Sequence, residues 1–125
     1  GGSSGKECLQ INVKDNSAFG SFVQIPAVDG TIEKIEVTIR EPYKGRAIGI
    51  FPVGYTYTKD TLDKMKEQLA KDAIAISNET PSDVNNNEPF TFVIDNLSAK
   101  NLTQFSIFPT LGAVSITAIT VTYSK

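Results

Sequence analysis

The chain is a series of short segments in which apolar and polar residues alternate. The clearest is residues 31–40, where Ile35 and Ile39 face one way and Glu36 and Arg40 face the other. A period of two in a stretch rich in β-branched residues is typical of a strand with one buried face and one wet face. We therefore expect a half-buried strand over residues 31–40.

Further segments are also rich in β-branched and aromatic residues, most of them alternate in the same way, and they end at Pro, Gly or Asp-containing turns. They cover residues 9–13, 21–25, 47–51, 90–95, 105–108 and 114–123, and a polar turn at 15–17 follows the first of them. Residues 47–51 are apolar at every position, which predicts a strand buried on both faces. The alternation in the last segment slips by one near Thr117 and Ala118, which predicts a β-bulge.

One stretch has the period of a helix. Between about residues 60 and 75, Leu62 and Leu69 share one face, and Asp60 is placed to cap the first turn. The polar stretch 77–89 that follows predicts a long surface loop. Seven or eight short strands with a single helix predict the all-β class: an antiparallel β-sandwich, as a jelly roll, with one inserted helix at about 60–75.

The length of 125 residues fits one domain. We expect residues 1–7 to be a flexible linker or an expression remnant and residues 8–125 to form a single β-sandwich domain. No apolar run approaches the roughly 18 residues of a membrane span, so none is expected. Cys8 is expected to be a small buried residue of the first strand.

The absence of histidine excludes several kinds of chemistry. The chain has no His and one Cys, so mechanisms with a histidine base, histidine metal sites and cysteine-rich zinc or disulfide frameworks are excluded. A net charge of −2 argues against nucleic acid as a partner. No carboxylate pair or Ser–Lys spacing selects a catalytic site, so we expect no enzyme and no cofactor. A structural calcium ion is left open, with Asp29 and Asp95 as candidate ligands.

Several segments together resemble a known group of domains. They are residues 22–26, 30–39, 105–109 and 114–123, the last with the sequence VSITAITVTY. These segments are similar to the galactose-binding-like jelly rolls, a group that includes many carbohydrate-binding modules. The resemblance implies a non-catalytic carbohydrate-binding module of a secreted or cell-surface bacterial protein. Its partners would be carbohydrate or the neighbouring domains of a larger chain.

Loop aromatics and polar side chains are the candidates for sugar binding. Pyranose rings stack on aromatic faces, and a chain without Trp offers tyrosine instead. Arginine and asparagine add planar donors and amide groups for hydroxyl recognition. The candidate ligand-binding residues are Tyr43, Tyr55, Tyr57, Arg40, Arg46 and Asn86. The alternative for Tyr55 and Tyr57 is packing beneath the helix or the long loop, and for the others it is simple solvation.

A second function fits the same pattern. The strands present threonine-rich exposed faces, which can pair edge to edge or dock a neighbouring domain. This alternative is a structural or protein-interaction domain, for adhesion or as an accessory part of a surface assembly. Both alternatives predict an extracellular or cell-surface location.

Overall fold

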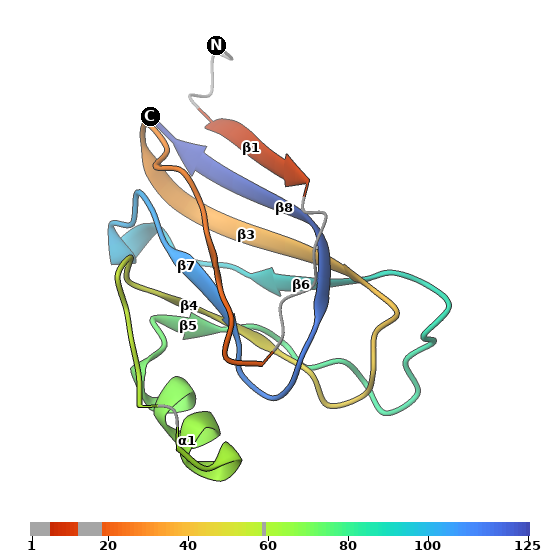
Figure 1. Cartoon of the computed structure of the whole chain (residues 1–125). Helices are drawn as coiled ribbons and strands as arrows, with labels where there is room; N and C mark the ends of the chain where they lie inside the picture. The colour runs from red at the N-terminus through yellow and green to blue at the C-terminus, as the bar shows by residue number, and fades with distance from the viewer. Residues whose placement is uncertain (1–5, 13–18, 59) are drawn as a thin grey trace.

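Two four-stranded antiparallel sheets pack face to face in the computed structural model, which describes residues 6–12, 19–58 and 60–125 (Figure 1). One sheet has the strand order β1-β8-β3-β6 and the other β2-β7-β4-β5. The strands are β1 Lys6–Asn12, β2 Val23–Gln24, β3 Thr31–Arg40, β4 Ile48–Phe51, β5 Ala75–Ile76, β6 Phe90–Ile94, β7 Ser106–Pro109 and β8 Ser115–Ser124. In both sheets, strands from the two halves of the chain interleave, which is the jelly-roll arrangement. The predicted fold class is confirmed.

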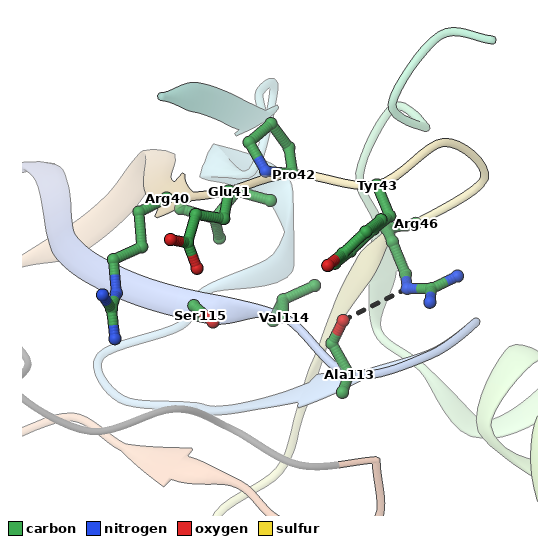
Figure 2. A pocket seen from close by; sticks show the side chains of 9 residues that line it. Arg40, Glu41, Pro42, Tyr43, Arg46, Ala113, Val114 and Ser115 are labelled. Carbon is green, nitrogen blue, oxygen red and sulfur yellow. Dashed lines mark hydrogen bonds between the residues drawn. The ribbon is translucent and has the colours of Figure 1, made fainter. Parts of the chain in front are cut away.

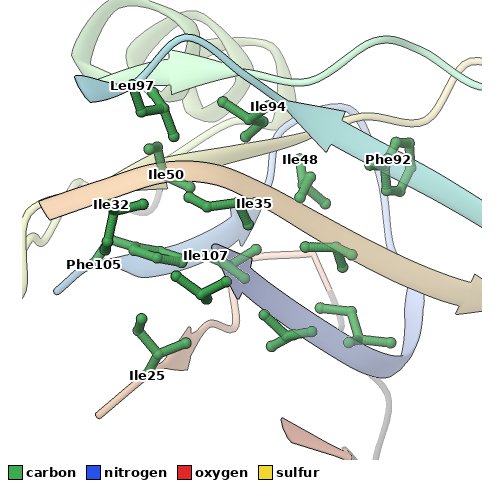
Figure 3. Packing of buried hydrophobic residues seen from close by; sticks show 14 of the residues in the cluster. Ile25, Ile32, Ile35, Ile48, Ile50, Phe92, Ile94, Leu97, Phe105 and Ile107 are labelled. Carbon is green, nitrogen blue, oxygen red and sulfur yellow. The ribbon is translucent and has the colours of Figure 1, made fainter. Parts of the chain in front are cut away.

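The main core lies between the two sheets and consists of their inward-facing aliphatic and aromatic side chains (Figure 3). Ile35 of β3, Ile50 of β4, Phe92 of β6 and Ile107 of β7 are fully buried within it. The alternation predicted for residues 31–40 is confirmed, because the inward side chains of β3 are buried while the outward ones keep contact with water. Burial of this continuous cluster is the main force that holds the sheets together.

The predicted bulge in the last strand is confirmed. Thr38 of β3 lies opposite Ala118, but the next residue, Ile39, lies opposite Ile116, so Thr117 is the extra residue. The Thr117 hydroxyl donates to the Thr38 backbone oxygen at 3.2 Å. One extra residue returns the alternation to the correct face, so both halves of β8 keep their apolar side chains in the core.

A second, smaller apolar layer covers the outer face of the β2-β7-β4-β5 sheet. The helix α1, Leu62–Asp72, lies against this sheet beside β4 and β5 (Figure 1). Its Leu69 is buried with Phe51 of β4 and Phe108 of β7. Strand β4 therefore has apolar cover on both sides, and this explains why every residue of the strand is buried.

Two local predictions about single residues are wrong. The helix N-cap is Thr61, whose hydroxyl accepts from the Lys64 backbone N–H at 3.3 Å, whereas Asp60 pairs with the Lys64 ammonium at 3.3 Å. Cys8 is exposed, because the neighbouring Leu9 faces the core and alternation turns Cys8 outward.

Some boundaries differ from those predicted. β1 begins at Lys6, before the predicted start of the first strand at Leu9, and β5 is a two-residue strand within a stretch for which no strand was predicted. The predicted end of the first strand at Val13 and the turn at 15–17 lie outside the described residues. In the described part of the chain, no helix has the length and apolar character needed to cross a membrane.

Candidate functional site

The candidate site lies at the end of the sandwich where β3 ends and β6 begins. The loop after β3, the turn before β8 and the end of β3 enclose a shallow pocket of about 250 Å³ (Figure 2). Its base is apolar, because Ile39 and Val114 belong to the main core. Its rim carries Arg40, Tyr43 and Arg46, three of the predicted site residues.

Arg46 and Tyr43 form one wall of this pocket. The Arg46 guanidinium carbon lies 5.8 Å from the centre of the Tyr43 ring, within the range of a cation–π contact. Arg46 Nε also donates to the Ala113 backbone oxygen at 3.1 Å, which ties the loop after β3 to the turn before β8. Gly112 permits this approach, because a side chain there would collide with the guanidinium group. Of the two candidate arginines, Arg46 is the one that the structure places over the Tyr43 ring.

Arg40 lies across the pocket from Arg46 (Figure 2). The next residue, Glu41, has φ 49°, in the left-handed region that non-glycine residues rarely adopt. This turn allows Pro42 to be buried while Tyr43 remains 60% exposed. Backbone strain of this kind persists only where surrounding contacts enforce it, so the shape of the rim is built into the loop.

Thr80 supplies much of that enforcement. Its buried hydroxyl donates to the Tyr43 backbone oxygen at 2.6 Å and accepts from the Arg46 backbone N–H at 2.8 Å. Its own backbone N–H donates to the Arg46 carbonyl at 2.9 Å. The long polar loop thus holds the Tyr43 loop in place through one side chain.

Asn86 lies beside the same loop. It lines a neighbouring hollow of about 260 Å³ with Tyr43 and Lys44, and a further one of about 460 Å³ with Arg40 and Glu41. The three hollows share walls, so Arg40, Tyr43, Arg46 and Asn86 belong to one end of the molecule. Four of the six predicted ligand-binding residues are therefore brought together.

Tyr55 and Tyr57 do not join this group. They follow β4 toward the other end of the sandwich, and their rings pack beneath α1 on Phe51 and Phe108 at centroid distances of 4.6 to 5.8 Å. Tyr55 Oη donates to Asp72 Oδ2 at 2.7 Å. Burial, and then this hydrogen bond, raise the pKa of Tyr55, and burial raises the pKa of Tyr57. These contacts correspond to the packing alternative.

The candidate calcium ligands lie at the end opposite the pocket. Asp29 precedes β3 and Asp95 follows β6, its antiparallel neighbour. Asp95 Oδ1 accepts from the Asn96 backbone N–H at 2.8 Å. No group of three or more Cys, Asp or Glu side chains able to hold a metal ion occurs among the described residues.

Sequence reasoning did not identify Thr80, Glu41 or Ala113 as parts of the site. Thr80 lies in a polar stretch with no periodic pattern, and its hydroxyl acts only through backbone groups far away in sequence. The Thr80-Pro81 dipeptide is a weak signal, because a residue before proline favours an extended backbone. Nothing in the sequence indicates which loop that extended segment would meet.

Several solved structures are similar to this one. The Tobacco streak virus coat protein dimer matches with a TM-score of 0.50 and 12% identity, over 97% of this chain and 86% of that one. A second crystal form of that coat protein matches with a TM-score of 0.49 and 10% identity, over 98% of this chain and 88% of that one. A Bacillus endospore appendage protein, described as forming disulfide-linked pili, matches with a TM-score of 0.36 and 13% identity, over 95% of this chain and 84% of that one. No family model and no curated protein sequence matches the chain. The chain therefore has a jelly-roll fold of the kind found in a viral coat protein.

Proposed function

We propose that this chain is a non-catalytic structural module that binds other protein domains through its β1-β8-β3-β6 sheet. The observation that carries the proposal is the uncovered outer face of this sheet. The opposite sheet has α1 and an aromatic layer over its outer face, whereas no described element covers this one. A solvent-facing sheet of four strands presents a broad surface to a partner.

The chemistry of this face suits contact with protein. Its side chains are Cys8, Gln10 and Asn12 from β1, Ala118, Thr120 and Thr122 from β8, Lys34, Glu36 and Thr38 from β3, and Thr91 and Val93 from β6. Lys34 and Glu36 at its centre pair at 3.7 Å, and Arg40 adds a positive charge where β3 ends. Charged groups are the most costly to bury, and this face has few of them. Its threonine hydroxyls can hydrogen-bond to polar groups of a partner, which offsets the cost of burying them.

The shared fold adds support. The coat protein structure with a TM-score of 0.50 is that of a dimer, so this fold can serve a protein that associates with itself. The fold leaves open which surface does so here, and the uncovered sheet is our assignment. A secreted or cell-surface location stays a prediction of the sequence resemblance.

Cys8 allows a direct test, because it is the single cysteine and is exposed on this face. We expect the chain to self-associate or to bind a neighbouring domain of its parent protein in analytical ultracentrifugation. A bulky maleimide label on Cys8 should abolish this association. The matched control is Cys8→Ser/Lys71→Cys, labelled on the exposed side of α1, which should still associate. A chain that stays monomeric and binds no neighbouring domain, or equal loss from both labels, would contradict the proposal.

Weak carbohydrate binding at the pocket is the second candidate. The observation that favours it is the Tyr43 ring, which is 60% exposed and stands between two hollows. Arg46 lies on one hollow and Asn86 on the other, so hydroxyl-binding groups flank an aromatic platform. The galactose-binding-like resemblance belongs to this proposal.

A glycan array followed by calorimetry tests it. Tyr43→Ala should abolish binding to any sugar found, whereas Tyr43→Phe, which keeps the ring, should preserve most of it. Tyr55→Phe serves as the control, because Tyr55 lies beneath α1 and away from the pocket. No binding tighter than about 1 mM, the affinity that corresponds to roughly −4 kcal/mol, would refute this candidate, and so would unchanged binding by Tyr43→Ala.

A further inference from the structure

The outer edges of the two sheets differ in how well they are blocked. β2 and β5 are two residues long, which makes them poor templates for pairing. On β6, the Asn78 side-chain oxygen accepts the Val93 backbone N–H at 3.0 Å and occupies that edge. β1 is seven residues long, contains no proline and pairs with β8 without a register shift. No described segment pairs with its other edge.

The side chains of β1 also favour a further strand. Leu9 and Ile11 pack against the main core but are only partly buried, because the sheet ends at β1. A neighbouring strand with apolar residues at matching positions would cover their open flank. The exposed side of the strand carries Gln10 between Cys8 and Asn12, so these three central positions bring no charge against a partner strand.

We propose that β1 pairs antiparallel with β1 of a second copy of this chain, about a two-fold axis at Gln10. The inference rests on the proposed function, names a second copy as the partner, and adds the free edge of the same sheet as the contact. In this register Leu9 lies opposite Ile11 of the other copy, and Gln10 lies opposite Gln10. The β1-β8-β3-β6 sheet of one copy then continues into the same sheet of the other copy, as a single sheet across both molecules.

Other registers fit less well. An axis at Cys8 or Leu9 places Glu7 opposite Leu9 or Ile11 of the second copy, whereas the axis at Gln10 pairs residues 8–12 of β1 and leaves Glu7 outside the paired segment. The Glu7 carboxylate is already engaged, with Tyr123 Oη at 2.9 Å and Lys125 Nζ at 3.1 Å. An axis at Ile11 overlaps only residues 10–12 of the two strands. The axis at Gln10 keeps the apolar pairs together and leaves the Glu7 contacts intact.

Disulfide trapping tests the register. Residues directly opposite in an antiparallel pair have Cα atoms about 4.5–5.5 Å apart, within the range that a disulfide bridges. Cys8→Ser/Gln10→Cys should therefore form a covalent dimer on mild oxidation. The control is Cys8→Ser/Thr120→Cys, because Thr120 lies beside Gln10 on the same face but one strand inward, on β8. We expect no covalent dimer from this control or from the unaltered chain, whose Cys8 would face Asn12.

A contact between two edge strands is smaller than the roughly 1,200–2,000 Å² of a stable interface, so we expect a concentration-dependent dimer. Gln10→Lys, which opposes like charges across the axis, should weaken it in analytical ultracentrifugation, and Thr120→Lys should not. Cross-linking through Cys8, or no cross-linking through Gln10→Cys, would overturn the edge pairing. If the unaltered chain associates, but Gln10→Cys gives no covalent dimer and Gln10→Lys leaves association unchanged, the edge pairing fails and the proposed function stands. If the unaltered chain neither associates nor binds a neighbouring domain, the proposed function itself fails.

Discussion

Removing the hydroxyl of Thr80 should destabilise the protein by about 2 kcal/mol. Thr80→Val keeps the shape of a side chain that is 3% exposed but leaves the Tyr43 carbonyl and the Arg46 N–H without their partner. An unsatisfied buried polar group costs about 1–3 kcal/mol, and we take the low end for each group because both lie near solvent. The reference is Thr80→Ser, which keeps the hydroxyl and loses one methyl group, at about 1 kcal/mol.

Urea unfolding followed by circular dichroism measures the difference between the two variants. Thr80→Val should have the lower midpoint at an unchanged slope, because the surface exposed on unfolding is the same. If Thr80→Val is as stable as Thr80→Ser, the hydroxyl does not hold the loop. The Tyr43 loop would then owe its shape to other contacts, and Thr80 would have no part in forming the pocket.

Three further changes probe other parts of the fold. Phe108→Ala removes a ring that packs against four others, so unfolding should show a loss of about 3–5 kcal/mol together with a weaker near-ultraviolet signal from the tyrosines. The hydrogen bond from Tyr123 and the nearby Lys125 ammonium lower the pKa of Glu7 below its ordinary value. The stability from this carboxylate is present above the ordinary pKa of a glutamate and is lost as the pH falls through the lowered folded-state pKa. Glu7→Gln should therefore flatten the acid side of the stability profile, whereas an unchanged profile would show that the contact contributes nothing. A methyl group in Gly30→Ala would overlap the backbone carbonyl at the end of β8. This overpacking should lower stability by about 1–3 kcal/mol, seen as a lower melting temperature. An unchanged melting temperature would show that the end of β8 moves aside at little cost.

The strands and the core were predictable because alternation reports burial directly. The bulge at Thr117 was visible as a slip in the pattern, and the same alternation places Cys8 on the exposed face, against our expectation. The two-residue strand β5 was not predictable, since two residues carry no period and their pairing with β4 is a long-range event.

The site was predictable only in part. Tyr43, Tyr55 and Tyr57 all lie in turn-rich segments, so the sequence offers no means to separate them. Tyr55 and Tyr57 are covered because α1 folds over the segment that carries them, whereas Tyr43 lies at the end of the sandwich where no helix reaches. The distinction depends on how distant elements pack, and local composition does not encode that packing.

The residues of β4 alternate between two separate apolar layers, with Ile48 and Ile50 in one and Phe51 in the other. Only the inner layer joins the two sheets, so α1 can detach while the sandwich stays closed. Hydrogen exchange should therefore occur in two tiers. Amides of α1 should exchange through a low-energy, sub-global opening, and those of β4 and β7 only when the whole domain unfolds. The covering helix would then behave as a separate cooperative unit within a single jelly roll.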